Sequence, residues 1–321
     1  MIRFVGALWV EVFTYARMIC AATVVAFGLP AFAQSSASFE NGTITLALAR
    51  YAEDADTSQR IDLSGKLRML SQRVVAEACF VQAGIATQDT IPALKATIFQ
   101  VSAILHALEF GNTSMGVFGA EDRRKTLAGI AQFNGLWASM QSKALTIAQG
   151  DGTADDVAKL NAQGTELLRA AYMLVTTITT QYANPAEMRQ ADAMVIDLAR
   201  RQQLLTQTMS RDVCLTVAGI ETEDALDTLT TARAAFNSSL GALSAGMPSL
   251  GIQAPPTSKI DASLSNLRAI WFDMRQPIDA QLSGASLNQA QLSAVFYGAS
   301  DLTRRMNSVV ALYAAASRFQ S

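Results

Sequence analysis

The segment from Ser64 to Arg73, Ser-Gly-Lys-Leu-Arg-Met-Leu-Ser-Gln-Arg, is the most distinctive local sequence of the 321-residue chain. On a helix that turns about 100° per residue, Ser64, Arg68 and Ser71 share one face. The planar guanidinium of Arg68 stays charged and matches the oxygens of a planar anion. A nearby hydroxyl and a glycine that bares the backbone, Ser71 and Gly65, complete a pattern typical of a nitrate or carboxylate site. The alternative for Arg68 is an ordinary exposed or salt-bridged arginine.

Arg73 lies five residues after Arg68 and therefore points about 140° away from it around a helix. The two guanidinium groups cannot reach one ligand from the same face. We therefore predict a structural contact for Arg73, with an acidic residue of the fourth helix such as Glu166 as its partner.

This segment belongs to a unit that occurs twice in the chain. Residues 61–85 align with residues 196–220 at an offset of 135, and nine of the 25 pairs are identical. Chance would give roughly two identities. Cys79 aligns with Cys214, and the similarity continues downstream to Trp137 and Trp271 after a slip of one residue. Each unit spans about 135 residues.

The second unit departs from the pattern of the first. Four residues of the first unit, Gly65, Arg68, Ser71 and Arg73, are replaced in the second by Arg200, Gln203, Thr206 and Thr208. At most one intact anion site therefore remains per chain. Arg200 and Arg201 either supply compensating charge from a neighbouring turn or form a solvated pair.

Apolar residues recur at helical spacing in each unit, and helix breakers separate these stretches. The buried stripe of the first helix is predicted to consist of Leu63, Leu67, Leu70, Val74 and Val81. Thr90 is predicted to cap a helix that ends near Gly111, whereas Ser286 and Gln289 form a capping-box pattern. Pro277 should kink the helix that carries Trp271. The first unit is further predicted to carry a helix from Gly119 to Gly150 and one from Thr153 to about Asn184. In the second unit, breaks are predicted near Glu221 and at Met247–Pro256.

Four helices per unit with short loops predict an all-α fold of two tandem antiparallel four-helix bundles. The regular turn signals favour this architecture over a single long coiled-coil rod. The bundles are expected at residues 34–183 and 184–321.

The composition excludes several classes of function. The chain is 50% hydrophobic and 16% charged with a formal net charge of −2, which offers no basic surface for nucleic acid. One histidine, His106, and three cysteines are too few for a His/Cys zinc site, and we predict no cofactor. No nucleophile with a base and an orienting group appears, so the protein is expected to be non-enzymatic.

Residues 1–33 have the pattern of a secretory signal peptide. Arg17 precedes an apolar run, and the sequence Ala31-Phe32-Ala33 is typical of a cleavage site after Ala33. Met18 is an alternative start, and an uncleaved membrane helix is the alternative to cleavage. No later stretch approaches 18 uncharged apolar residues, so none is expected to span a bilayer. These features predict a periplasmic protein in which disulfides are permitted.

The segment from Ser64 to Arg73 resembles the first helix of the periplasmic sensor domains of the nitrate/nitrite sensor kinase NarX and of the type IV pilus chemotaxis transducer PilJ. Their Gly-x-x-Arg-Met-x-Ser-x-Arg box is matched by Gly65, Arg68, Met69, Ser71 and Arg73. The resemblance implies that Arg68 and the backbone around Gly65 bind a small planar oxyanion such as nitrate or nitrite. It also implies that this helix lies at a dimer interface.

These observations together predict a non-enzymatic periplasmic sensory module that signals through a separate membrane-bound signalling or transport protein. A separate partner is expected because the chain shows no kinase, methyl-accepting or second membrane segment. The alternative is a structural or adaptor protein that kept the bundle and lost the ligand. The intact first box favours the sensor, whereas the degenerate second box favours the adaptor.

Tandem units with a short linker at residues 183–185 hold two copies of a dimerising surface at high effective concentration. We therefore predict that the units pack through their first helices as an intramolecular pseudo-dimer. Cys79 shares a helix face with Arg68, and Cys214 shares one with Gln203. If these faces meet across a twofold axis, Cys79 and Cys214 can form a disulfide. The alternative is that each cysteine is a small buried residue inside its own bundle.

Overall fold

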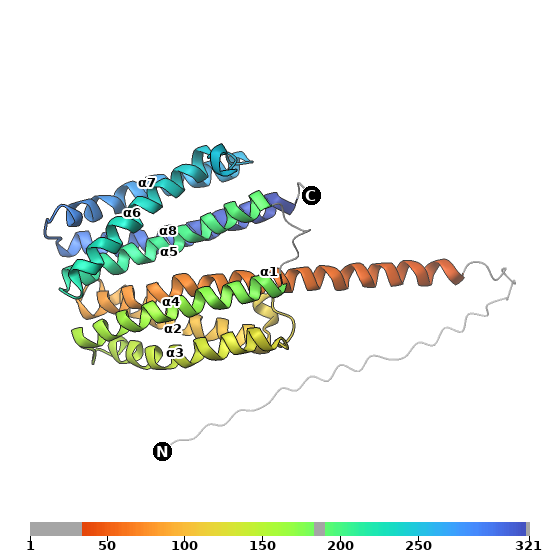
Figure 1. Cartoon of the computed structure of the whole chain (residues 1–321), viewed down its shortest axis with the longest axis horizontal. Helices are drawn as coiled ribbons and strands as arrows, with labels where there is room; N and C mark the ends of the chain where they lie inside the picture. Colours follow the sequence, from red (N-terminus) through yellow and green to blue (C-terminus); the bar gives the residue numbers. More distant parts are fainter. Residues whose placement is uncertain (1–33, 183–189, 319–321) are drawn as a thin grey trace, which may run out of the picture. The chain divides into compact units, whose positions relative to one another are not determined.

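The computed structural model describes residues 34–182 and 190–318, with side chains described for 55–182 and 194–317. The described residues form helices, and Figure 1 shows them in chain order. The four helices of the first unit are α1 (Gln34–Gln82), α2 (Thr87–Phe110), α3 (Arg124–Ala148) and α4 (Ala154–Tyr182). Those of the second are α5 (Gln190–Val217), α6 (Thr222–Ala245), α7 (Ser258–Leu282) and α8 (Gln289–Arg318). The predicted signal peptide and the linker at 183–185 lie outside the described residues.

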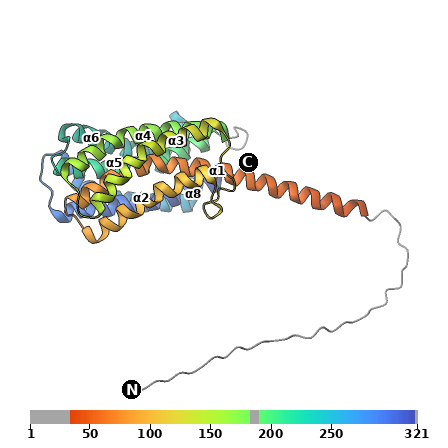
Figure 2. The same cartoon turned by 90° about the horizontal axis from the view of Figure 1, so that it is seen from below.

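The predicted all-α fold of tandem helical bundles is confirmed. The helices of each unit run alongside one another (Figures 1 and 2). Within the units α3 contacts α4 and α7 contacts α8. The predicted stripe of α1 is buried, because Leu63, Leu67, Leu70, Val74 and Val81 are each at most 8% exposed. Burial extends beyond this stripe to almost every residue from Leu63 to Val81. A helix buried on all sides needs neighbours on all sides.

The duplication extends to the loops. Ala86 and Glu221, which are 135 residues apart, both adopt the left-handed conformation at the start of α2 and α6. The loops after α2 and α6 each close with an isolated bridge, Asn112 to Val117 and Met247 to Ile252. The sequence repeat therefore produces a structural repeat down to the backbone of single residues.

Helix boundaries near Gly111, Gly150, Glu221 and Gly284 agree with the predicted breaks, but two predicted caps are wrong. Thr90 does not cap α2, because its hydroxyl donates to the carbonyls of Ile85 and Ala86 while the helix begins at Thr87. The predicted box at Ser286 and Gln289 is replaced by one at Asn288 and Gln291, whose side chains each accept the other's backbone N–H at 3.0 Å. An asparagine cap is as effective as serine, so the helix starts at the later box.

Pro277 lies inside α7, which continues to Leu282.

Two equivalent tryptophans anchor the third helices to the second helices of their bundles. Trp137 Nε1 donates to the hydroxyl of Ser102 at 3.1 Å, and Trp271 Nε1 donates to Asn237 Oδ1 at 2.7 Å. Ser102 and Asn237 are also 135 residues apart, so the second unit keeps the contact with a different acceptor.

Helix α2 is long and apolar enough by composition to cross a membrane, contrary to the expectation that no stretch after the leader would be. Nearly half of that stretch is buried inside the protein. Its buried residues, which include Leu94, Ile98, Val101 and Leu105, belong to the core of the bundle. A core helix passes the same composition test.

A buried network joins α1 to the loop between α2 and α3. The Arg60 side chain is 3% exposed, and its Nε donates to Asp56 at 2.6 Å. Its terminal nitrogens donate to the carbonyls of Leu108 and Gly119 and approach the Glu121 carboxylate to 3.5 Å. Arg60 therefore holds three segments of the first unit together.

Candidate functional site

Helices α1 and α5 contact each other along several turns. The contacts pair Asp62 with Arg200, Arg68 with Asp197, Gln72 with Arg211 and Cys79 with Cys214. From the two ion pairs near Asp62 and Arg68 to the disulfide at Cys79, the partners on α5 move from Asp197 and Arg200 to Cys214, so the two helices run in the same direction. The predicted site residues of the first unit lie along this contact.

Arg68 is largely buried, with 10% of its side chain exposed. Its Nη2 lies 3.4 Å from Asp197 Oδ1, at the outer limit of a hydrogen bond. The guanidinium carbon lies 5.2 Å from the ring centre of Tyr172 on α4, within cation–π range. Arg68 thus has one aromatic face and one weak carboxylate partner, which belongs to the other unit.

Gly65 lies between two arginines. A Cβ at this position would be 3.9 Å from Arg68 Nη2 and 3.9 Å from Arg200 Cδ. Both distances are ordinary van der Waals contacts, so a methyl group would occupy the space beside both side chains. The glycine therefore leaves the α1 backbone uncovered beside the Arg68 guanidinium.

The hydroxyl of Ser71 is engaged inside its own helix. It donates to the carbonyl oxygen of Arg68 at 2.7 Å and accepts from Gln72 Nε2 at 3.3 Å. The structure therefore brings Gly65 and the Arg68 guanidinium together, whereas the Ser71 hydroxyl is directed to the backbone.

Arg200 is not part of a solvated pair. Its Nη2 donates to Asp62 Oδ1 at 3.0 Å, and its side chain is 20% exposed, whereas Arg201 is exposed. The interpretation of a solvated pair is therefore wrong for Arg200. Asp62 and Asp197 occupy equivalent positions, and each pairs with an arginine of the other unit. Sequence reasoning missed these aspartates, although their identity in both repeats was the available signal.

Gln203, the equivalent of Arg68, faces α8 of its own bundle. Its Nε2 donates to the Thr303 carbonyl at 3.2 Å and to Asn307 Oδ1 at 2.6 Å. Asn307 is the equivalent of Tyr172, so both first helices direct this position toward the same place on the fourth helix. The second unit satisfies the contact with neutral amides and offers no charge to an anion there.

Arg73 pairs with Glu77 and not with Glu166. The distance from Arg73 Nε to Glu77 Oε1 is 2.6 Å, whereas Glu166 approaches Arg169 on its own helix to 3.7 Å. A partner one turn along the same helix is reached without any tertiary contact. Glu77 is almost fully buried, and this burial raises the pKa of its carboxyl despite the opposing charge of Arg73.

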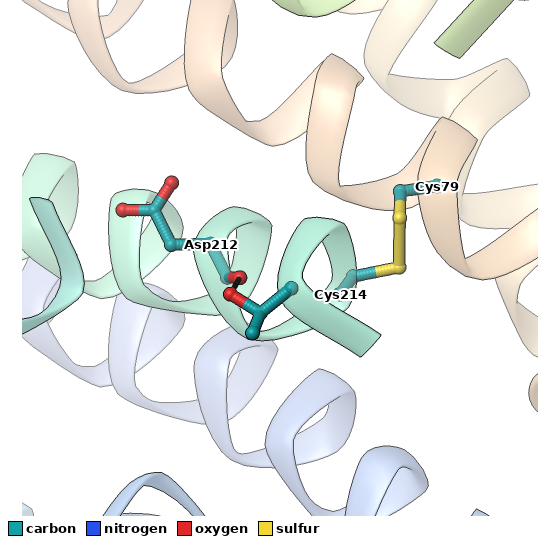
Figure 3. Close-up of a disulfide and its surroundings, with 4 residues drawn as sticks. Cys79, Asp212 and Cys214 are labelled. Atoms are coloured by element: carbon teal, nitrogen blue, oxygen red, sulfur yellow. Dashed lines mark hydrogen bonds between the residues drawn. A yellow bond between two sulfur atoms is a disulfide. The ribbon is translucent and has the colours of Figure 1, made fainter. Parts of the chain in front are cut away.

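Cys79 and Cys214 are joined by a disulfide in the structure, with 6.1 Å between their Cα atoms (Figure 3). Both residues are buried, and the bond connects the C-terminal parts of α1 and α5. Asp212 lies two residues before Cys214 and is also buried. The third cysteine, Cys20, lies outside the described residues.

Burial raises the pKa of Asp212 to about 6, and the neighbouring Arg211 only partly opposes this shift. Because the folded-state pKa lies above the unfolded one, this group favours folding below the unfolded pKa, and that contribution is lost as the pH rises through 6. We expect the free energy of unfolding to rise by about 1–1.5 kcal/mol when the pH falls from roughly 7.5 to roughly 5. Urea denaturation at both pH values measures it. The Asp212→Asn variant should lose this increment, and an equal increment in that variant would contradict the assignment.

His106 is exposed and packs against Phe110, with 4.9 Å between ring centres. Within residues 55–182 and 194–317, no cluster of three or more His, Cys, Asp or Glu side chains is arranged to hold a metal ion. The chemistry of the described site is therefore that of arginines, carboxylates and an aromatic ring.

Comparison with known families gives one match, which occurs twice. The family described as PilJ, the N-terminal domain of type IV pili methyl-accepting chemotaxis transducers, matches residues 52–163 and 186–296. The two matches cover both units and more than half of the chain. None of the curated proteins searched matches the chain.

Proposed function

Because the chain belongs to the PilJ family of chemotaxis-transducer N-terminal domains, we propose that it is a periplasmic sensory module that binds a small planar oxyanion at Arg68. Nitrate and nitrite are the proposed ligands. The observation that carries this proposal is the buried Arg68 guanidinium, which lies beside Gly65 and whose carboxylate partner among the described residues, Asp197, is 3.4 Å away.

An incoming anion would replace Asp197 as the partner of Arg68. The Asp197 side chain is 57% exposed, so it can turn into solvent at little cost when an oxyanion takes its place. The Tyr172 ring covers one side of the guanidinium and excludes water, which strengthens a charge-assisted contact. Because Asp197 belongs to the second unit, ligand binding would loosen one contact between the units. This is a means of converting binding into a change in how α1 and α5 pack.

Replacing Arg68 by alanine is expected to weaken nitrate or nitrite binding about ten- to a hundredfold, because it removes the guanidinium proposed to bind the ligand. Isothermal titration calorimetry of the periplasmically expressed protein measures the affinity. Arg201→Ala, which removes an exposed arginine of α5, is the matched control and should bind like the wild type. Unchanged affinity in Arg68→Ala would place the ligand elsewhere.

We further propose that the two units form an intramolecular pseudo-dimer through α1 and α5. The crossed pairs of Asp62 with Arg200 and Asp197 with Arg68 support this arrangement, as does the Cys79–Cys214 bond. Small-angle X-ray scattering tests it, because an extended rod of two separated bundles has a much larger radius of gyration. The signalling partner is proposed to be a membrane protein, in keeping with the transducer family.

The second candidate function is a structural or adaptor role without a ligand. The neutral contacts of Gln203 with Thr303 and Asn307 favour it, because one of the two boxes has already replaced its cation. A titration in which nitrate, nitrite and formate all produce no binding heat at millimolar concentration would support the adaptor and exclude the sensor.

A further inference from the structure

A groove of about 590 Å³ lies where α8 of the second unit faces α1 and α2 of the first. Its lining includes Lys66, Met69 and Arg73 on α1 and Tyr297, Asp301 and Arg304 on α8. The three α1 residues recur at the i, i+3, i+7 spacing of one helix face, from which Arg68 points away by about 100° or more. The groove is therefore distinct from the proposed nitrate site.

Cationic groups converge on this groove from both walls. Lys66 Nζ pairs with Asp62 at 2.8 Å, and Arg73 uses its Nε for Glu77. Among the described residues, no hydrogen-bond or ion-pair partner reaches the terminal nitrogens of Arg73. On the opposite wall, Arg304 shares the carboxylate of Asp301 with Arg305. Each wall thus carries N–H donors that can bind an anion, from Lys66 and Arg73 on α1 and from Arg304 on α8.

Hydrogen bonds fix the α8 wall in place. The Tyr297 hydroxyl donates to Asp89 on α2 at 2.6 Å, which ties α8 to the first unit beside the groove. Two further lining residues, Thr303 and Asn307, accept hydrogen bonds from Gln207 and Gln203 of α5. These hydrogen bonds hold the α8 wall against α2 on one side and α5 on the other.

Two residues that line this groove, one on α1 and one on α8, are not repeated at the equivalent positions of α5 and α4. At the equivalent positions of the other pair of helices, Thr208 stands for Arg73 and Ala162 stands for Tyr297. A guanidinium equivalent to that of Arg73 and a hydroxyl equivalent to that of Tyr297 are therefore both absent at those positions. The duplication of the fold alone does not account for this set of residues.

We propose that the groove is a second ligand site, which takes a small organic anion with a carboxylate at each end. Lys66 and Arg73 are seven residues apart, which is about 10 Å along the helix, and a planar ion such as nitrate cannot span that distance. A dicarboxylate can engage both, with Arg304 closing the opposite side. The volume lies within the range of about 300–1,000 Å³ that is typical of small-molecule sites. This inference does not depend on the nitrate site.

Calorimetric titration of the full chain with succinate, adipate and acetate tests the proposal. We expect at least one dicarboxylate to bind and acetate to bind at least tenfold more weakly. Arg304→Gln should weaken the dicarboxylate about tenfold. The Arg304 side chain is 75% exposed, so its loss leaves the fold intact. Arg305→Gln is the matched control, because Arg305 also pairs with Asp301 but does not line the groove.

Three results would overturn the proposal. The first is a folded wild-type protein that binds neither dicarboxylate at millimolar concentration. The second is an equal loss of affinity in Arg304→Gln and Arg305→Gln, which would indicate a general effect of surface charge. The third is acetate that binds as tightly as the dicarboxylates. Nitrate titrations separate the two proposals, because Arg304→Gln should leave the nitrate affinity unchanged and Arg68→Ala should leave dicarboxylate binding unchanged.

Discussion

Replacing Cys79 and Cys214 together by alanine is expected to lower the free energy of unfolding by about 5 kcal/mol. The two residues are 135 positions apart, so the bond closes a long loop and restricts the unfolded chain strongly. In the chain-entropy model a loop of this length is worth about 5 kcal/mol, which is an upper figure because measured values often fall short. Guanidinium denaturation of the wild type and the double variant measures the difference.

Two controls separate the bond from the packing of the sulfur atoms. Both cysteines are buried, so alanine also removes core contacts. The reduced wild-type protein keeps the sulfur atoms and loses only the bond, so its loss of stability isolates the loop closure. The single variant Cys79→Ala should match the double variant to within the cost of one side chain. If the unreduced wild-type protein yields two freely alkylated thiols by intact mass, no bond is present and the expected difference vanishes.

The internal repeat made the backbone of this protein predictable. Many aligned positions report one backbone environment twice, as the left-handed Ala86 and Glu221 show. The repeat also shows where the two units differ. The change from Arg68 to Gln203 directed attention to a single site, and the structure places both side chains against the same position of their fourth helices, Tyr172 and Asn307.

Side-chain pairing was much less predictable than the helices. The sequence does not state how each helix is rotated against its neighbours, so the pattern does not distinguish Glu166 from Glu77, the partner of Arg73 one turn away on its own helix. The partners of Arg68 could not be predicted for the same reason, because Tyr172 and Asp197 come from two different helices. The predicted cap at Ser286 failed because Asn288, which has equal capping ability, lies two residues further on.

The Arg60 network was also missed, because nothing in the sequence around Arg60 differs from a surface helix. The second unit has no counterpart, since Val195 replaces Arg60 and Pro256 replaces Glu121. The hydroxyl of Tyr182, at the end of α4, donates to the Glu121 carboxylate at 2.7 Å. Burial and this hydrogen bond raise the pKa of Tyr182 to about 12. The first unit alone is therefore fastened at this end by a buried ion pair.

Replacing Arg60 by methionine is expected to destabilise the protein by about 3–5 kcal/mol, because the Glu121 side chain is only 1% exposed and would lose its buried cation. Removing both charges in Arg60→Met/Glu121→Gln should recover part of this loss, since no uncompensated charge then stays buried. Arg305→Met, which breaks a solvent-exposed pair with Asp301, is the control and should cost less than about 1 kcal/mol. Urea denaturation of the three variants gives these differences. If Arg60→Met and Arg305→Met cost the same, the Arg60 network does not hold the loop of the first unit in place.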